Sequence, residues 1–320
     1  MKTLTSAITV LLLGASAVSV AAMDGKPAKP EKPAGARKPV YDEKADARKQ
    51  IDAALAAARR ENRRVLIQWG ADWCPWCVLL HERFGSDRNL AKELRYEYDV
   101  VLVDVGKKDK NVDLATHYGA DVKKHGIPFL TVLGGDGKVL ANQSTEPFEI
   151  RAEGKRSHDG KKLLEFLHAH EARPVRAEEV LARALAAADR SGRNVFLHFG
   201  APWCGWCLRL DAWLARPDVA AVLSKDFVEV KVDLDRMTGA KEVFNRYHPA
   251  ADGGVPWFAL LDARGKAIVT SDGPDGNIGF PAVDKEIAYF AKMLAAGRRH
   301  ISDSDIESLR KTLMPSLAKG

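Results

Sequence analysis

Residues 64–77 read RVLIQWGADWCPWC and residues 194–207 read NVFLHFGAPWCGWC, two copies of one pattern 130 residues apart. In each copy an apolar run rich in β-branched or aromatic residues leads through Gly-Ala into Trp-Cys-x-Trp-Cys. Such a run is typical of a buried strand. A cysteine three residues after another lies nearly one helical turn further on. The pattern therefore predicts a strand followed by two neighbouring thiols at the start of a helix.

The repeat extends on both sides of these motifs. A shift of 130 superposes residues 54–58 on 184–188, and small deletions then carry Asp104 onto Asp233 and Pro128 onto Pro256. A solenoid needs three or more copies, and 320 residues suit about two domains. We therefore expect two complete domains followed by a short C-terminal part. The expected boundaries are 41–172 for the first domain, 173–300 for the second, and 301–320 for a C-terminal helix and tail.

Both domains predict the same order of elements. An Ala-rich helix leads into the strand before the cysteines, and a helix, a second strand and a Gly-x-Pro segment follow them. A strand, a Gly-containing hairpin turn, a last strand and a closing helix complete each copy. Alternating β and α elements followed by a hairpin favour an α/β fold, a mixed central sheet with helices on both faces. The expected helices cover about 43–62, 161–171, 177–191 and 282–296, and the expected strands 65–69, 100–103, 129–133, 194–199, 228–232 and 257–261.

The N-terminal 40 residues differ from the rest in composition. Lys2, an uncharged apolar stretch over 8–20 and small residues at 20–22 predict a signal peptide over 1–22, so we expect an exported, periplasmic or secreted protein. No later run is long and apolar enough to span a membrane after cleavage. Residues 23–40 are rich in proline and lysine, which predicts a flexible leader.

The charge distribution argues against nucleic-acid binding. The formal net charge is +6, but Lys2 and the leader carry +4 of it, which leaves +2 for residues 41–320. With 46% hydrophobic and 29% charged residues, the chain has ordinary globular composition. We expect no nucleic-acid partner.

All four cysteines lie in the two Cys-x-x-Cys pairs. A cysteine at a helix start is favoured as a thiolate, because free N–H groups and the helix dipole stabilise negative charge there. In such a pair the exposed thiol attacks and the buried one resolves the mixed disulfide. Zinc or copper(I) binding and inert structural disulfides are the alternatives. The bulky Trp76 and Trp206 and the 130-residue separation disfavour a metal site, and so short a loop gains little from a structural disulfide.

The sequence resembles the thioredoxin superfamily, here as two tandem exported thioredoxin-like domains. The resemblance rests on Trp73-Cys74-Pro75-Trp76-Cys77 and Trp203-Cys204-Gly205-Trp206-Cys207, each followed about 50 residues later by Ile127-Pro128 or Val255-Pro256. It is closest to the thioredoxin-like part of periplasmic disulfide reductases. It implies that Cys74 and Cys204 are nucleophiles and that Cys77 and Cys207 resolve. It also implies that both prolines are cis beside the site, where Ile127 and Val255 pair with substrate backbone.

Two departures from thioredoxin concern the groups beneath the cysteines. The buried Asp of thioredoxin corresponds to Gln68 and His198, and its Lys on the next strand corresponds to Val100 and Glu229. Strand alternation puts Phe196, His198 and Gly200 on one face. His198 is therefore either a proton acceptor for Cys207, held by Glu229, or a hydrogen-bonded core histidine. His81 and Asp211, seven residues after each first cysteine, either tune the thiolate or are solvated helix residues, the reading we favour.

These observations predict a thiol–disulfide oxidoreductase, more reductase-like than oxidising, that acts on protein or small-thiol substrates. An unidentified electron-donor or acceptor protein would recharge it. No cofactor and no metal are expected, because the cysteines carry the electrons. The alternatives are a disulfide isomerase and a non-catalytic chaperone or metallochaperone.

Overall fold

The computed structural model describes residues 38–152, 154–249 and 254–313. The expected signal peptide and all but the last three residues of the leader lie outside this part. The first repeat contains six α-helices, a short 3₁₀ helix (Glu146–Phe148), a four-stranded sheet and a separate β-hairpin. Its helices are α1 (Ala47–Glu61), α2 (Pro75–Ser86), α3 (Arg88–Glu97), α4 (Val112–His117), α5 (Val122–His125) and α6 (Gly160–His168). Its strands are β1 (Arg64–Gly70), β2 (Tyr98–Asp104), β3 (Phe129–Leu133), β4 (Val139–Ser144), β5 (Glu149–Ala152) and β6 (Lys155–His158).

The second repeat has the same order of elements with a different ending. Its helices are α7 (Ala177–Ser191), α8 (Gly205–Leu214), α9 (Pro217–Leu223), α10 (Ala240–Tyr247), α11 (Asp284–Gly297) and α12 (Asp303–Leu313). Its strands are β7 (Asn194–Gly200), β8 (Phe227–Asp233), β9 (Trp257–Leu261), β10 (Ala267–Thr270), β11 (Asp272–Gly273) and β12 (Gly276–Asn277).

Both central sheets are mixed and have the same topology. The strand orders are β2-β1-β3-β4 and β8-β7-β9-β10. The strand before each cysteine pair runs parallel to its neighbour on one side and antiparallel to the next on the other. In register, Gln68 lies opposite Leu102, and His198 lies opposite Lys231. Each cysteine pair therefore follows a central strand, whose end is fixed by hydrogen bonding on both sides.

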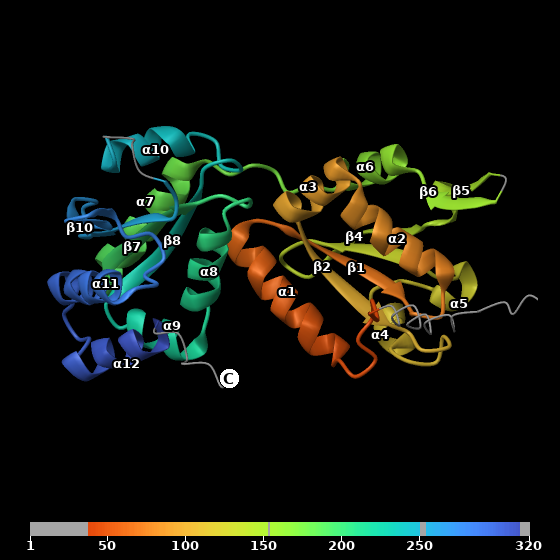
Figure 1. Ribbon diagram of the computed structural model, residues 1–320, viewed down its shortest axis with the longest axis horizontal. Helices are drawn as coiled ribbons and strands as arrows, with labels where there is room; N and C mark the ends of the chain where they lie inside the picture. The colour runs from red at the N-terminus through yellow and green to blue at the C-terminus, as the bar shows by residue number, and fades with distance from the viewer. Residues whose placement is uncertain (1–37, 153, 250–253, 314–320) are drawn as a thin grey trace, which may run out of the picture. The chain divides into compact units, whose positions relative to one another are not determined.

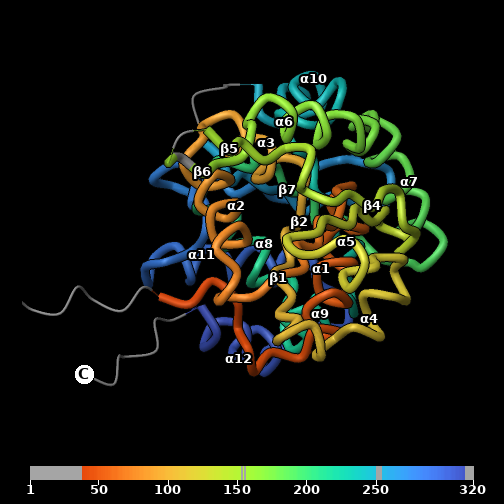
Figure 2. The backbone as a smooth tube through the Cα atoms, turned by 90° about the vertical axis from the view of Figure 1, so that its right-hand side faces the viewer, coloured from red at the N-terminus to blue at the C-terminus, as the bar shows by residue number. Residues whose placement is uncertain are grey.

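Helices cover both faces of each sheet, as the sequence predicts (Figures 1 and 2). On one face of the first sheet, Val65, Ile67 and Trp69 pack with α1, α4 and α5. On the other face, Leu66 packs with α2, α3 and α6. This alternation follows from the period of two along a strand. Since both faces are buried, β1 is apolar from Val65 to Gly70 except at Gln68.

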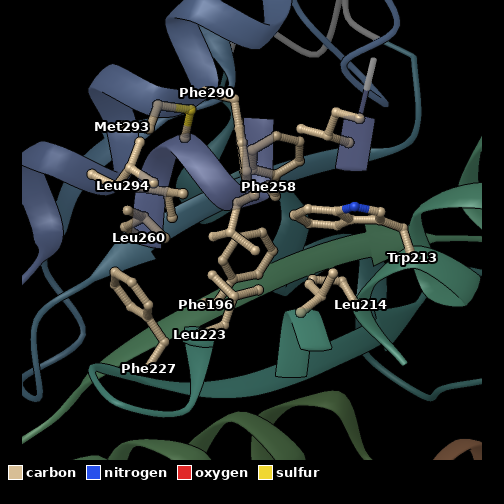
Figure 3. Close-up of a cluster of buried hydrophobic side chains, with 14 of the residues drawn as sticks. Phe196, Trp213, Leu214, Leu223, Phe227, Phe258, Leu260, Phe290, Met293 and Leu294 are labelled. Atoms are coloured by element: carbon tan, nitrogen blue, oxygen red, sulfur yellow. The ribbon is translucent and has the colours of Figure 1, made fainter. Parts of the chain in front are cut away.

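The second repeat has an aromatic core on the face that carries Phe196 (Figure 3). The Phe196 and Phe258 rings stack with centroids 5.4 Å apart, and Phe290 packs edge-on against Phe258 at 5.8 Å. Val195, Leu197 and Phe199 point to the opposite face and pack with α7 and α10. The expected division of β7 between the two faces is confirmed.

The last helix, α12, belongs to this aromatic core. Ile306, Leu309 and Leu313 pack into the same cluster as Phe196, and Trp213 Nε1 donates to Thr312 Oγ1 at 2.8 Å. Asp226, which is fully buried, accepts backbone N–H groups from residues 299–301 and so fixes the connection between α11 and α12.

Several boundaries differ from the sequence-based expectation. The single helix expected after each cysteine pair is two helices. Asp87 ends α2 and starts α3, because its carboxylate accepts the N–H groups of Asn89 and Leu90. Pro217 occupies the first turn of α9, where its missing N–H costs nothing. Helix α1 begins at Ala47 rather than near residue 43, because the Asp46 side chain caps its first turn. The β5–β6 hairpin was not expected from the sequence. Among the described residues, no helix is long and apolar enough to cross a membrane.

Candidate active site

The two cysteine pairs form disulfides at equivalent places in the two repeats. Cys74 is bonded to Cys77 and Cys204 to Cys207. Each first cysteine is the N-cap of the helix that follows, α2 or α8. Its Sγ accepts the backbone N–H of the second cysteine, at 3.2 Å in the first repeat and 3.1 Å in the second. An N–H group aimed at sulfur, together with the helix dipole, stabilises the thiolate that forms on reduction.

Both members of each pair are buried in the disulfide form. The first cysteines are 4% and 5% exposed, the second 0% and 2%. We expected an exposed first cysteine and a buried second one. In the disulfide form the exposed fractions of the two differ by only a few per cent. Access is from the side of the first sulfur, beside exposed indoles. Trp73, Trp203 and Trp206 are each at least half exposed, and Trp76 is partly buried.

The peptide bonds before Pro128 and Pro256 are cis, as the sequence predicts. The Ile127 carbonyl oxygen lies 3.6 Å from Cys74 Sγ, and the Val255 carbonyl oxygen lies 3.4 Å from Cys204 Sγ. A disulfide sulfur has no proton, so these are contacts in the oxidised protein. After reduction the same oxygens can accept a hydrogen bond from the thiol.

The tryptophans at the rim have different neighbours. Trp73 Nε1 donates to the Gly106 carbonyl at 2.7 Å, and Trp203 Nε1 donates to Asp235 at 2.9 Å. Trp206 stacks on Phe280. Each site therefore has exposed indole rings that neighbouring groups hold in place.

Trp76 packs edge-on against the ring of His158, with centroids 5.4 Å apart. His158 lies on β6 and is 1% exposed, and neither of its ring nitrogens has a hydrogen-bond partner in the described part of the chain. Burial, with a smaller effect of the Arg83 charge, lowers the pKa of His158 from 6.5 to about 4. The histidine is therefore neutral at pH 7, and no feature of the sequence indicated its burial.

Beneath the first pair lie uncharged groups. Gln68 is fully buried, and its Nε2 donates to the Cys77 carbonyl at 3.0 Å and to the Tyr41 hydroxyl at 2.6 Å. Tyr41 is 1% exposed and packs against Cys74 and Cys77. Gln68 lies where the sequence predicts, whereas Tyr41, which precedes α1 and belongs to no motif, was not expected at the site.

Beneath the second pair lie charged groups. His198 Nε2 is 3.2 Å from Glu229 Oε1, and its Nδ1 is 3.7 Å from Asp211 Oδ1. The Lys231 ammonium pairs with Asp211 at 2.6 Å. The expected contact between His198 and Glu229 is present, whereas the expectation that Asp211 is solvated is wrong, since its side chain is 11% exposed. His81, its counterpart in the first repeat, is exposed.

These contacts shift the pKa values of the second cluster. Burial raises the pKa of Glu229, but the hydrogen bond with His198 and the nearby positive charges together outweigh burial and hold this pKa below its ordinary value. Burial lowers the pKa of Lys231, but Asp211 and Glu61 outweigh burial and hold it above its ordinary value. Lys231 therefore stays charged at neutral pH. Lys231 lies opposite His198 in the strand register, two residues after Glu229, the position that corresponds to the lysine of thioredoxin.

One group of metal-type ligands exists among the described residues. The ligand atoms of Glu93, His168 and Glu171 lie within 4.8 Å of one another. Burial and the neighbouring Glu171 raise the pKa of Glu93 to about 8. His168 Nε2 lies 3.3 Å from Glu93 Oε2 and 3.8 Å from Glu171 Oε1, and no cysteine belongs to the group.

The thioredoxin-like family model matches residues 46–135 and 176–263, one copy in each repeat. This chain belongs to the thioredoxin-like family. The two matches begin near α1 and α7 and end shortly after β3 and β9. They confirm the expected superfamily and the α/β fold of two tandem domains.

Individual relatives cover parts of this thioredoxin-like chain. "Protein disulfide-isomerase erp38" of Neurospora crassa is 25% identical over 225 residues, which are 68% of this chain and 54% of the relative. The chain thus spans about half the length of that curated relative. A disulphide isomerase from Xylella fastidiosa Temecula1 is 36% identical over 33% of this chain and 80% of its own, with a TM-score of 0.32. The oxidised C-terminal domain of Neisseria meningitidis DsbD is 17% identical over 40% and 97% of the two chains, with a TM-score of 0.30.

Proposed function

We propose that this chain is an exported thiol–disulfide oxidoreductase that reduces disulfides of protein or small-thiol substrates. The observation that supports this most directly is repeated in both halves. The first cysteine of each pair caps a helix and accepts the N–H of the second, which favours a reactive thiolate at that sulfur. The signal-peptide pattern of residues 1–22 supports export, and an oxidising compartment would supply disulfide substrates.

In the proposed reaction the first cysteine is the nucleophile. The thiolate of Cys74 or Cys204 attacks one substrate sulfur and forms a mixed disulfide. The other substrate sulfur leaves with the electron pair and takes a proton from water. The thiolate of Cys77 or Cys207 then attacks the first cysteine, forms the intramolecular disulfide and releases the second substrate thiolate. The protein ends oxidised by two electrons, so a reduced donor thiol must restore it.

The rim of each site supports an extended polypeptide as substrate. The carbonyl groups of Ile127 and Val255 lie beside the attacking sulfurs, so a substrate strand can pair with the backbone there. Trp73 and Trp203 flank the same openings.

The direction of electron flow is tested by the reduction potential of each pair. Variants with one pair changed to serine isolate the other pair, and each is equilibrated against a series of glutathione ratios. For a reductase we expect values near that of thioredoxin, about −270 mV. Values near that of DsbA, about −120 mV, would refute the reductase assignment and indicate an oxidant.

An isomerase is the second candidate, because the relative from Neurospora crassa carries that name. An isomerase reshuffles scrambled disulfides without net electron transfer and needs mainly the first cysteine. We therefore expect Cys77→Ser/Cys207→Ser protein to lose the proposed net reduction. If this variant rescued scrambled substrate as fast as the unmodified protein, isomerisation would be the better assignment. Suppression of aggregation by protein with all four cysteines changed to serine would instead indicate a chaperone.

A further inference from the structure

The segment before α1 brings a tyrosine under the first cysteine pair. The Val40 N–H donates to Asp72 Oδ1 at 2.8 Å, and the Tyr41 N–H lies 3.4 Å from the same oxygen. Asp72 lies in the loop between β1 and Cys74. The segment is thus tied to the loop that carries the nucleophile, and Tyr41 reaches inward to contact both cysteines.

The hydrogen bonds around Gln68 determine which way the Tyr41 proton faces. The Cys77 carbonyl can only accept, so the nitrogen of the Gln68 amide must face it. The same nitrogen lies 2.6 Å from the Tyr41 oxygen, which therefore accepts from Gln68. The phenol proton then points elsewhere, and within the described residues no oxygen or nitrogen accepts it. Tyr41 holds a buried donor without an acceptor in the oxidised protein.

The sulfur of Cys77 and the Tyr41 hydroxyl border the same space, which lies beside the Cα of Gly70. A Cβ placed on Gly70 would collide with the Tyr41 hydroxyl and would lie 3.1 Å from Cys77 Sγ. Only the absence of a side chain at position 70 lets the hydroxyl and the sulfur share this space. In the second repeat a Cβ on Gly200 would lie 3.4 Å from Cys207 Sγ and 3.9 Å from the Lys231 side chain. The equivalent space there holds the stem of a lysine.

We propose that the Tyr41 hydroxyl donates a hydrogen bond to Cys77 Sγ once the pair is reduced, and so stabilises the Cys77 thiolate for the resolving step. This inference rests on the proposed exchange reaction. The Cys77 thiol gives its proton to water, and the thiolate attacks Cys74 Sγ. The Cys74–Cys77 bond forms, the bond from Cys74 to the substrate breaks, and the substrate thiolate leaves with the electron pair.

The charges around Tyr41 keep the phenol a donor. Burial raises its pKa above the ordinary value, and Asp72 and Asp104 add to this effect. Asp104 pairs with Lys110 at 3.1 Å, and Asp72 accepts from the backbone of the tyrosine segment. A neutral phenol cannot take the proton of Cys77, so Tyr41 acts by hydrogen bonding and not as a base.

The test follows resolution in protein whose second pair is changed to serine. The reduced protein is mixed with an aromatic disulfide that releases one coloured thiolate on attack by Cys74 and another on resolution by Cys77. A hydrogen bond to an ionised group shifts a pKa by about one unit. In Tyr41→Phe we therefore expect the pH profile of the second phase to move up by about one unit.

The sign of the rate change depends on pH. Below both pKa values the variant has about tenfold less thiolate, but its more basic thiolate is a better nucleophile, so resolution slows about threefold. Above both pKa values the variant resolves about threefold faster. A merely structural defect would slow the step at every pH. Replacement of Tyr41 by 3-fluorotyrosine, which keeps the shape and strengthens the donor, should move the profile the other way.

Controls separate this inference from the proposed function. Tyr98→Phe removes another buried hydroxyl of the same repeat, which donates to Leu167, and should leave the profile in place. If the parent protein released no second thiolate, the exchange reaction at this site would be wrong. If the parent resolved normally while Tyr41→Phe and 3-fluorotyrosine left the profile unmoved, Tyr41 would have no role in the chemistry.

Discussion

Replacing His158 by phenylalanine should change how the first repeat responds to acid. The ring is 1% exposed, packs against Trp76 and has no hydrogen-bond partner among the described residues. Phenylalanine keeps the flat ring and the edge-on contact with Trp76 and removes the two unsatisfied nitrogens. A buried polar group without a partner costs about 1–3 kcal/mol. We therefore expect His158→Phe to be more stable than the parent at pH 7 by about 1 kcal/mol or more.

The larger effect is on the pH dependence. Folding lowers the pKa of His158 from 6.5 to about 4. Between these values the unfolded chain binds a proton that the folded chain does not, so acid favours unfolding. Stability is therefore lost as the pH falls from about 6.5 to about 4. A difference of about 2.5 units corresponds to roughly 3 kcal/mol at the acid end. In His158→Phe this part of the loss should disappear.

The assay is urea unfolding with hydrogen exchange read on peptides from β1, which reports the first repeat alone. The difference in free energy of unfolding between pH 7 and pH 4 is compared for parent and variant. His81→Leu, which removes an exposed histidine from α2, serves as the matched control and should keep the parent slope. If His158→Phe lost as much stability toward pH 4 as the parent, the histidine would not be buried as a neutral ring.

Three further predictions concern the cysteines and the second site. Cys77→Ser and Cys207→Ser should each accumulate a mixed disulfide with substrate, seen by mass spectrometry after acid trapping. Equal accumulation in the protein with all four cysteines would contradict the assigned roles. The second prediction concerns His198→Gln in protein whose first pair is changed to serine. If the imidazole takes the proton of Cys207, this variant should flatten the pH dependence of resolution between about pH 5 and pH 9. An unchanged profile would mean that His198 is only a hydrogen-bonded core histidine. Lys231→Met should destabilise the second repeat by about 3 kcal/mol, since it removes the closest positive charge from the buried Asp211 carboxylate. A second change of Asp211 to leucine should recover most of this loss.

The fold was readable because its signals are local and repeated. A strand, Trp-Cys-x-Trp-Cys and a later X-Pro occur twice, and the period of two along β7 placed Phe196 and Phe199 on opposite faces. The division of the expected helix into α2 and α3 was missed: Asp87 is a strong N-cap residue, but the apolar pattern runs on through it. The β5–β6 hairpin gave no such signal, because it is polar and mostly exposed.

The groups beneath the cysteines were less predictable, for two physical reasons. Tyr41 reaches its site from 33 residues before Cys74 through contacts that only the folded chain makes. Lys231 lies on the expected strand, but its place beside His198 depends on the register of β7 and β8. Register is set by the pairing of the whole sheet, which a single strand's sequence does not specify. Asp211 was judged from its helix alone, although its partner comes from another element.

The packing of α12 against the aromatic core determines the shortest fragment of the second repeat that should fold by itself. A fragment cut where the family match ends, at residue 263, would lack α11 and α12 and leave Phe196 and Phe258 open to water. A cut at residue 300 would still free the Asp226 carboxylate from the Ile301 N–H and remove Thr312 from Trp213. Anyone who excises this half for crystallisation or for separate electrochemistry should therefore carry the chain through Leu313.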